Sequence, residues 1–500
     1  MTSRLPNRDD PINIVGAGIF GLSTAIHLAR RGYTKVTVFD KQLYDETRYS
    51  YLNGCDAASA DINKIIRSAY GGQTEYQDLA IEALSIWNSW NDEIASGKTV
   101  PPGMTTADRV FINNGHMVLT DADSLETLPA FEAATIAGME AAGYKDTQLI
   151  TADPRHQEIA KSKGLESAMN AFRRKDKNKV NVGVLDITGG LTVADKACCF
   201  ALCKARSLGV NFVLGSIAGE FQTVYFEPGT NTKAVGIKTR DGTIHPAAMN
   251  IVACGGWTPS LIPELDGLCE ATAGSVALLK IPRESPLFSR LGPDRFPSWQ
   301  YKMRDGAEGG LYGFPRDDDG WFKVGYRGTK YTNPVKQDDG KERSVPITRW
   351  SSPSTEASDR RIKAVPKQAL KVIQSFLDDF VPELATEGIK VSLSRICWYT
   401  DSYDNHFVID RVPGRDGLMV ATGGSGHAFK YLPIIGSWVV DVLEGVGLER
   451  PGIKACRWRK LEAGVQPGNV LMEGSRGSRA LGNVPLSSDT ELSRGGRPKL

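Results

Sequence analysis

Three glycines near the N-terminus, Gly16, Gly18 and Gly21, have the G-x-G-x-x-G spacing of a turn that binds a dinucleotide pyrophosphate. The first glycine permits the tight turn, the second lets a phosphate approach the backbone, and the third lets the next helix pack closely. Asp40 follows about 20 residues later, where an acid could hold a ribose hydroxyl. The spacing therefore predicts an adenine dinucleotide site, and a glycine-rich turn without a ligand is the alternative.

The residues around these glycines predict the elements that would position them. Residues 12–15 are a short apolar run typical of a buried strand, residues 22–29 carry an apolar stripe at helical spacing, and residues 36–39 form a second apolar run. Gly32 would end the helix. This order predicts a Rossmann-type unit. The cofactor-binding residues expected in it are Gly16, Gly18, Ile19, Phe20, Gly21, Asp40 and Lys41.

Composition excludes several classes of protein. The chain has 500 residues, 41% of them hydrophobic, which suggests two or three domains or one large two-domain enzyme. A formal net charge of +2 argues neither for nor against nucleic acid, but no basic stripe interleaved with aromatic residues occurs, so we expect no nucleic-acid partner. We expect no transmembrane helix and no signal peptide, because long apolar runs are absent. The eight cysteines lack zinc-ligand spacing, so we expect free thiols and no metal site.

Two cations, Lys64 and Arg67, are three residues apart and are expected to share a helical face. They could form a solvated face or a cationic patch beside an anionic cofactor. Other helices are expected over residues 75–91, 193–208, 368–380 and 434–444. Strands are expected over residues 210–214, 223–226, 234–244 (as a hairpin), 250–254, 298–303, 310–314, 321–326, 389–398, 407–410 and 417–422.

Three further segments have weaker patterns. Residues 110–119 predict a strand pair around an Asn113-Asn114-Gly115 turn. Residues 329–366 are polar and rich in Pro, Ser and Asp, which indicates a long loop. Residues 464–500 lose hydrophobic periodicity, and we expect them to be mostly disordered.

Five motifs in chain order resemble the monomeric sarcosine oxidase family, over about residues 13–445. The fungal branch is the most similar, and it contains the fructosyl amino acid oxidases (amadoriases) and the saccharopine or pipecolate oxidases. The motifs are Asn63-Lys64-Ile65-Ile66-Arg67, Phe322-Lys323-Val324-Gly325-Tyr326, Cys397-Trp398-Tyr399-Thr400, His406-Phe407-Val408-Ile409-Asp410 and Gly424-Ser425-Gly426-His427-Ala428-Phe429-Lys430.

The resemblance implies an FAD-dependent oxidase that converts the C–N bond of a secondary amine into an imine and reduces O2 to hydrogen peroxide. In the family a cysteine thiolate joins the 8α-methyl carbon of the flavin, and the matching residue is Cys397. Outside this motif, a cysteine near a strand end would be interpreted as a small buried hydrophobe. The resemblance therefore predicts covalently attached FAD.

The resemblance also assigns roles to cations. Lys323 matches a lysine that promotes electron transfer to oxygen, although a surface lysine on an edge strand is the alternative. Lys430 matches a lysine that holds the substrate carboxylate, with a solvated lysine as the alternative. Lys64 and Arg67 would flank the flavin or the substrate. The catalytic candidates are Lys323, Lys64, Arg67, Lys430 and Tyr399, and the further cofactor candidates are Cys397, Lys64, Gly426, His427 and Lys430.

Two positions depart from the sarcosine branch. Ala60 and Arg327 stand where that branch has histidines, so sarcosine itself is not the expected substrate. Tyr326, Trp398 and Tyr399 could line an aromatic pocket or belong to the core. For His427, a hydrogen bond to flavin and a structural hydrogen bond are equally compatible with the motif.

Several functions remain open at this point. The substrate could be a fructosyl amino acid, saccharopine or pipecolate, or an N-methyl amino acid of secondary metabolism whose imine product cyclises. A flavin dehydrogenase with another electron acceptor, a nicotinamide-dependent reductase and a catalytically silent flavin-binding scaffold are the rival classes. Lys323 favours an oxidase over a dehydrogenase.

The expected fold is α+β, of the glutathione-reductase-like or D-amino-acid-oxidase type, with a discontinuous Rossmann-type FAD-binding domain and a mixed-sheet substrate domain. The former is expected over residues 1–100, 185–265 and 390–450, and the latter over residues 101–184 and 266–389, followed by a tail over residues 451–500. The terminal Pro498-Lys499-Leu500 resembles a peroxisomal address. We expect a monomer in the peroxisome or the cytoplasm, without a membrane partner.

Overall fold

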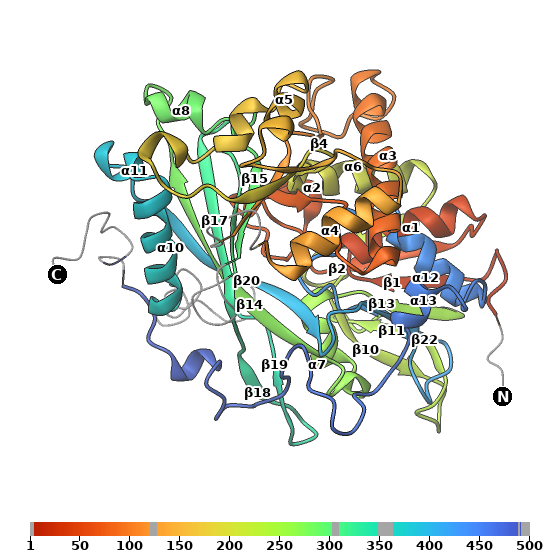
Figure 1. Ribbon diagram of the computed structural model, residues 1–500. Helices are drawn as coiled ribbons and strands as arrows, with labels where there is room; N and C mark the ends of the chain where they lie inside the picture. The colour runs from red at the N-terminus through yellow and green to blue at the C-terminus, as the bar shows by residue number, and fades with distance from the viewer. Residues whose placement is uncertain (1–4, 121–127, 303–309, 349–363, 489–490, 492–500) are drawn as a thin grey trace.

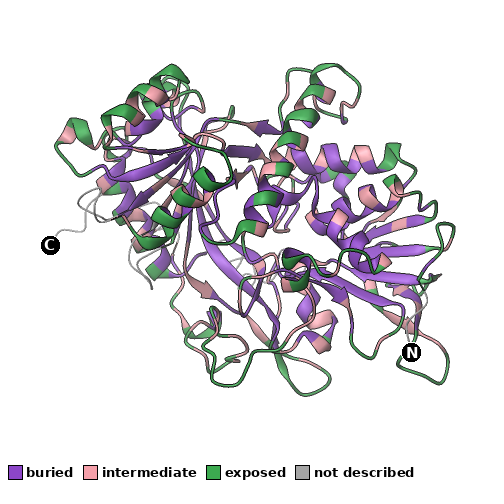
Figure 2. Ribbon diagram, turned by 45° about the vertical axis from the view of Figure 1, so that its right-hand side comes forward, coloured by how far each residue is buried: buried purple, intermediate pink, exposed green. Residues whose placement is uncertain are grey.

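A computed structural model describes residues 5–120, 128–302, 310–348, 364–488 and 491 (Figure 1). Two large sheets dominate it: a six-stranded sheet lies on the right of Figure 1 near α1 and α12, and an eight-stranded sheet lies on the left near α10. Both sheets are buried, while the outer faces of the helices are exposed (Figure 2). The helices that surround them are α1 (Ile19–Arg30), α2 (Tyr44–Thr47), α3 (Thr74–Ala95), α4 (Ala130–Ala141), α5 (Pro154–Ser162), α6 (Ala194–Ser207), α7 (Thr258–Leu261), α8 (Pro286–Arg290), α10 (Lys367–Phe380), α11 (Glu383–Thr386), α12 (Ile435–Glu444) and α13 (Pro451–Ala455).

The six-stranded sheet contains the predicted βαβ unit. Its strands are parallel except β21, which is antiparallel to β22. The central strands β1 and β13 are buried along their whole length, as expected where both faces of a sheet are covered, and their asparagines, Asn13 and Asn250, hydrogen-bond to each other at 3.2 Å. Its order is β21 (Val408–Arg411), β22 (Leu418–Thr422), β13 (Met249–Val252), β1 (Ile12–Val15), β2 (Val36–Asp40) and β9 (Asn211–Leu214).

Helices α1 and α12 pack closely against each other at a glycine. A Cβ on Gly436 of α12 would lie 2.1 Å from the carbonyl oxygen of Ser23 in α1, so only glycine fits there. The backbone N–H of Gly436 also donates to the hydroxyl of Ser23 at 2.8 Å. The C-terminal helix is therefore fixed against the helix that begins at the glycine turn.

The eight-stranded sheet is mixed, and one face of it forms a second core with α10. Within this core Trp299 and Phe376 stack at a centroid distance of 4.6 Å. Strand β20 pairs with β14 along almost its whole length. The order is β20 (Val391–Ser402), β14 (Cys269–Lys280), β17 (Trp321–Tyr331), β16 (Leu311–Gly313), β15 (Ser298–Lys302), β5 (His116–Thr120), β7 (Gly183–Asp186) and β6 (Gln148–Ile150).

Three small sheets complete the fold. One of them, β3–β8–β4, joins the two halves of the molecule, and another contains the predicted hairpin over residues 234–244. Their strands are β3 (Asn63–Ile66), β8 (Gly190–Val193) and β4 (Phe111–Ile112); β10 (Phe221–Phe226), β11 (Ala234–Thr239) and β12 (Ile244–Pro246); and β18 (Pro334–Lys336) and β19 (Glu342–Ser344). In the described parts of the chain, no helix is both long and apolar enough to cross a membrane.

The expectation of a shared helical face for Lys64 and Arg67 is wrong. Residues 63–66 form strand β3, in which Lys64 pairs with Thr192 of β8. The isoleucines at 65 and 66 favour a strand because β-branched residues pack well on a pleated surface. In an extended segment two residues three apart point to opposite sides, so the two cations reach different neighbours.

Two other local expectations are also corrected. Strands β4 and β5 flank the predicted turn but do not pair with each other, because β4 pairs with β8 and β5 pairs with β7 and β15. The expected loop over residues 329–366 contains the end of β17 and the hairpin β18–β19, while residues 349–363 lie outside the described residues.

The tail was expected to be mostly disordered from residue 464, but it is ordered up to residue 488. The backbone N–H of Leu481 donates to the carbonyl of Thr332 at 2.8 Å, and that of Ser487 donates to the carbonyl of Val365 at 2.8 Å. Leu481 is 9% exposed and belongs to the second core. Backbone pairing with distant residues therefore orders this segment without hydrophobic periodicity. Residues 489–490 and 492–500 lie outside the described residues.

The division into two domains remains a proposal, with one changed boundary. Strand β20 begins at Val391 and belongs to the sheet of the substrate domain, although residues 390–450 were expected in the FAD-binding domain. We therefore propose that the chain returns to the FAD-binding domain after Ser402.

We predict that Leu481→Ala lowers the free energy of unfolding by about 2 kcal/mol, because it removes buried methyl groups and leaves a cavity. Leu461→Ala is the matched control, since Leu461 is 39% exposed and its change should cost less than about 0.5 kcal/mol. Denaturant unfolding of both variants measures the difference. Equal effects would show that the tail does not pack on the core.

Candidate active site

A groove of about 210 Å³ lies at the carboxyl ends of β1, β2 and β13. This is the edge at which parallel α/β sheets bind ligands. The predicted residues Gly16, Gly18, Ile19, Phe20, Asp40 and Lys41 line the groove, together with Asp56, Ala57, Ala58, Ser59, Trp257 and Trp398.

The glycine turn has the properties that a pyrophosphate needs. A Cβ on Gly16 would lie 2.5 Å from the carbonyl oxygen of Ala253, and one on Gly21 would lie 1.8 Å from that of Gly16, so both glycines are required for packing. Gly18 precedes α1, where no side chain caps the helix and no acid occupies its first turn. The first N–H groups of α1 thus remain available to an anion, and the site fits a dinucleotide.

Asp40 is held at the edge of the groove. Its carboxylate accepts hydrogen bonds from the backbone N–H groups of Ala17 at 2.8 Å and Gln42 at 2.9 Å. Burial raises its pKa, although these hydrogen bonds oppose the shift. The ammonium of Lys41 lies 4.4 Å from the ring centroid of Trp257 in the wall of the groove. Both residues are therefore positioned at the nucleotide end.

The eight-stranded sheet presents a polar face that contains Lys323, Arg327, Cys397 and Tyr399. Alternation of side chains along β17 and β20 places them on one face, with Cys397 opposite Gly274 of β14. Side chains of the other face belong to the second core. They include Phe322, Val324, Tyr326, Ile396 and Trp398, so Tyr326 is a core residue.

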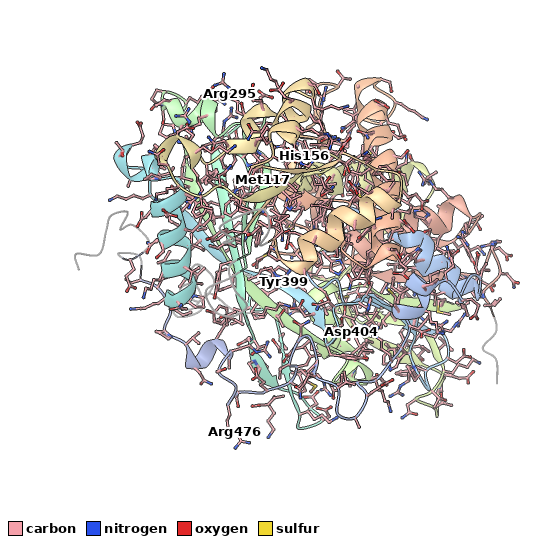
Figure 3. The ribbon with its side chains drawn as sticks, viewed as in Figure 1. Met117, His156, Arg295, Tyr399, Asp404 and Arg476 are labelled. Atoms are coloured by element: carbon pink, nitrogen blue, oxygen red, sulfur yellow. The ribbon has the colours of Figure 1, made fainter. Side chains whose placement is uncertain are left out.

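Three glycines make room for large side chains on this polar face. A Cβ on Gly274 would lie 2.2 Å from the hydroxyl of Tyr399, and one on Gly325 would lie 2.1 Å from the ring of Tyr312. A Cβ on Gly426 would lie 1.7 Å from Nη1 of Arg327. Figure 3 labels Tyr399 near the middle of the molecule, whereas the labelled Arg476 is at its periphery. The rings and the guanidinium thus lie against backbone inside the fold.

Asp61 is the centre of a buried charge cluster on this face. Its Oδ2 lies 2.8 Å from Nζ of Lys323, 2.7 Å from Nζ of Lys64 and 3.4 Å from Nη2 of Arg395. Lys323 is fully buried and also donates to the carbonyl of Asn63 at 2.7 Å. One carboxylate therefore joins three cations from β3, β17 and β20.

Burial and charge act against each other in this cluster. Burial alone would raise the pKa of Asp61, but Lys323, Lys64 and Arg395 hold it well below its usual range. Burial lowers the pKa of Lys323 to about 8, even though Asp61 favours its charged form. Burial also opposes the charge of Lys64, yet Asp61 raises its pKa. The ammonium of Lys323 is thus charged at neutral pH and close to losing its proton.

A second group surrounds the glycine turn at residues 423–427. The buried ammonium of Lys430 donates to the hydroxyl of Tyr70 and, at 3.2 Å, to the carbonyl of His427. The imidazole of His427 lies 3.2 Å from the Tyr70 hydroxyl and 3.0 Å from the carbonyl of Asn405. The guanidinium of Arg67 lies 4.5 Å from the ring centroid of Tyr70. Arg67 and Lys430 thus meet at one tyrosine, while Lys64 belongs to the Asp61 cluster.

Sequence reasoning missed the acids that organise the cations. Asp61 is buried at the centre of its charge cluster, and Asp401 is buried 3.3 Å from Nη2 of Arg327. Arg395 and Tyr312 complete the polar face. Arg395 could have been found from its position two residues before Cys397 in one strand. Asp61 gave no sign of its contact with Lys323, since that contact depends on the pairing of distant strands. No group of His, Cys, Asp or Glu could hold a metal ion within the described ranges.

A family model described as "DAO: FAD dependent oxidoreductase" matches residues 12–442. This chain belongs to that family. Its members use FAD, and the groove and glycine turn fit this cofactor. The predicted α+β fold of the D-amino-acid-oxidase type and the predicted FAD are therefore confirmed.

Individual DAO-family proteins are similar along most of the chain. L-saccharopine oxidase of Schizosaccharomyces pombe is 28% identical over 459 residues, which cover 90% of this chain and 93% of that protein. N-methyl-L-tryptophan oxidase of Salmonella typhimurium is 25% identical over 433 residues, which cover 86% and 94%. The structure of fructosamine oxidase (Amadoriase II) from Aspergillus fumigatus superposes with a TM-score of 0.66 at 25% identity, covering 91% of this chain and 90% of that one. The predicted resemblance to these oxidases is confirmed.

We predict that Asp61→Asn lowers the free energy of unfolding at pH 7 by about 3–5 kcal/mol, because buried Lys323 and partly buried Lys64 lose their counter-charge and Arg395 loses one of its two acids. The folded pKa of Asp61 is depressed below the unfolded value of about 3.9, so the wild-type advantage is present above that pH and declines as the pH falls below it. Denaturant unfolding between pH 3 and pH 7 measures this. Asp61→Glu, which keeps the carboxylate, is the control, and an equal loss in both variants would contradict the electrostatic cause.

Proposed function

We propose that this protein is an FAD-dependent oxidase that converts the C–N bond of an N-substituted amino acid into an imine and reduces O2 to hydrogen peroxide. The observation that carries the proposal is the fully buried ammonium of Lys323, which is held by Asp61, two residues after Ser59 in the wall of the groove. The names of the related proteins, oxidases of saccharopine, N-methyl-L-tryptophan and fructosamine, support the same reaction class.

The groups around the turn at residues 423–427 suit the carboxylate of an amino acid. Lys430 and Arg67 are two basic side chains that both contact Tyr70. Neither forms an ion pair with a carboxylate in the described parts of the chain. Burial, together with repulsion by Arg67, lowers the pKa of Lys430 well below its usual range. A bound carboxylate would restore the charge of this lysine and fix the substrate.

The reaction itself requires little acid–base chemistry from the protein. The substrate nitrogen must be neutral, because its lone pair expels a hydride from the neighbouring carbon and forms the C=N bond of an iminium ion. Loss of the N–H proton to water then gives the imine. When bound, FAD supplies the two-electron acceptor for this hydride. Lys323 contributes a fixed positive charge where oxygen gains negative charge. The imine then hydrolyses in water to a carbonyl compound and an amine, or it cyclises.

We further propose that FAD is attached through Cys397. The thiol is buried, and Cys397 lies two residues after Arg395 in β20, so both side chains are on the polar face, where Arg395 contacts Asp61. A thioether forms when the thiol and the 8α-methyl carbon each lose one hydrogen, and O2 is the final acceptor of the two electrons.

The compartment and the assembly state are also proposals. The terminal Pro498-Lys499-Leu500 lies outside the described residues and resembles a peroxisomal address. An oxidase that releases hydrogen peroxide would suit the peroxisome. We propose that the enzyme acts there as a monomer.

We predict that the purified protein forms peroxide with N-alkyl amino acids, and that Lys323→Met slows reoxidation of the reduced enzyme by O2 about 100-fold or more. Anaerobic reduction by the same substrate should continue. Stopped-flow absorbance of the flavin separates the two steps. Lys280→Met is the control. The ammonium of Lys323 lies 4.4 Å from the ring centroid of Phe314 and that of Lys280 lies 4.5 Å from the ring centroid of Trp321, but Lys280 is exposed. Rapid reoxidation of Lys323→Met would exclude the proposed role of Lys323.

We predict that acid precipitation of the wild-type protein leaves the yellow flavin in the pellet, and that Cys397→Ser releases it into the supernatant. The control is Cys269→Ser, since Cys269 is another buried cysteine in the same sheet. Absorbance of the two fractions measures the distribution. Flavin that stays in the Cys397→Ser pellet would place the bond elsewhere.

A further inference from the structure

Three basic side chains, Arg67, Arg327 and Lys430, surround the turn formed by residues 423–427. Nη1 of Arg327 lies against Gly426, and Lys430 donates to the carbonyl of His427 at 3.2 Å. Burial, followed by repulsion from Lys430, Arg67 and Arg327, lowers the pKa of His427 well below its usual range. His427 is therefore neutral at physiological pH, and it cannot add to or offset the charge of its neighbours.

The fixed acids at this turn do not balance these cations. Asp401 is fully buried, and it lies 3.3 Å from Nη2 of Arg327 and 3.5 Å from Nζ of Lys330. One carboxylate thus faces two cations. Burial lowers the pKa of Lys330 to about 8, so Lys330 is still charged at pH 7. Among the described residues no acid pairs with Arg67 or Lys430. A substrate carboxylate bound there would still leave Arg327 and Lys330 to share the single carboxylate of Asp401.

Arg327 is held in place and retains free hydrogen-bond donors. Its guanidinium lies 4.5 Å from the ring centroid of Tyr399, while Asp401 binds one end of it. Its buried Nε has no hydrogen-bond partner among the described residues. A guanidinium that is stacked and oriented in this way is suited to binding a carboxylate.

The surroundings of Arg327 keep this geometry fixed. Lys330 donates to the amide oxygen of Asn469 at 2.5 Å, and that amide donates to the carbonyl of Ser402 at 2.7 Å. The hydroxyl of Thr272 donates to Asp401. Asn469 in the tail therefore positions Lys330, and Lys330 pairs with Asp401, which orients Arg327.

We propose that Arg327 binds a second carboxylate, carried by the substituent on the substrate nitrogen. The substrate class is then the N-(carboxyalkyl) amino acids, with one carboxylate at Lys430 and Arg67 and the other at Arg327. This inference rests on the proposed oxidase function, and it makes Arg327 the residue that selects among N-substituted amino acids.

The test uses non-reactive acids in which a thioether sulfur replaces the amine nitrogen. The probes are methylthioacetate, with one carboxylate, and thiodiacetate and its homologues with a longer second arm, which have two. Each is titrated into the holoenzyme, and the change in flavin absorbance gives its Kd. We expect the best dicarboxylate to bind about 10-fold to 100-fold more tightly than methylthioacetate. Arg327→Gln should remove this ratio, and Arg327→Lys should keep part of it.

Arg174→Gln is the matched control. Arg174 also lies over an aromatic ring, 4.1 Å from the centroid of Phe380, and pairs with one carboxylate, Asp379, at 2.9 Å, but it belongs to the second core. Its loss should leave the ratio unchanged.

The inference would be overturned if the wild type bound monocarboxylates and dicarboxylates equally, or if Arg327→Gln left the ratio of their Kd values unchanged. The proposed oxidase function would stand in that case, provided that N-alkyl amino acids still gave peroxide. Absence of peroxide from every amine tested would instead remove the proposed function. The binding ratio would then still decide for or against a second carboxylate site at Arg327.

Discussion

The carboxylate of Asp61 is the interaction on which the active-site face depends. It pairs with Lys64, Lys323 and Arg395, which come from three strands that are far apart in the chain. Three cations buried at this distance from one another would repel strongly in a medium of low dielectric constant. Because the acid lies in the segment that leads from the nucleotide groove into β3, it also connects the two halves of the molecule.

The same carboxylate sets the properties of the lysine that we assign to oxygen. Burial disfavours the charge of Lys323, whereas Asp61 favours it, and the resulting pKa of about 8 keeps the ammonium charged at neutral pH. At the other end of the site, no acid of the described residues pairs with Lys430, so in our proposal the counter-ion comes from the substrate. The proposed roles of the two lysines thus differ because Lys323 has a fixed counter-ion and Lys430 does not.

Sequence patterns predicted the local elements well, but they did not predict which distant strands and side chains pair with one another. The βαβ unit depends on neighbouring residues, and its strands, helix and Asp40 are where the pattern placed them. Lys64 and Arg67 were placed on a helix, because their spacing of three fits helical periodicity, but pairing with β8 makes the segment a strand. The tail up to residue 488 was also misjudged, since it is ordered by backbone pairing with distant strands, which leaves no periodic signal.

The sequence by itself determined the dinucleotide turn, the flavoprotein family and the chemical types of Lys323 and Cys397, because these depend on short motifs with local geometry. Only the tertiary structure decided which acid each cation meets and which face of the sheet each side chain occupies. Asp61 reaches Lys323, and Asp401 reaches Arg327, through pairing between strands that are remote in the chain. The charge of a buried group is fixed by such neighbours, and no spacing along the chain records them.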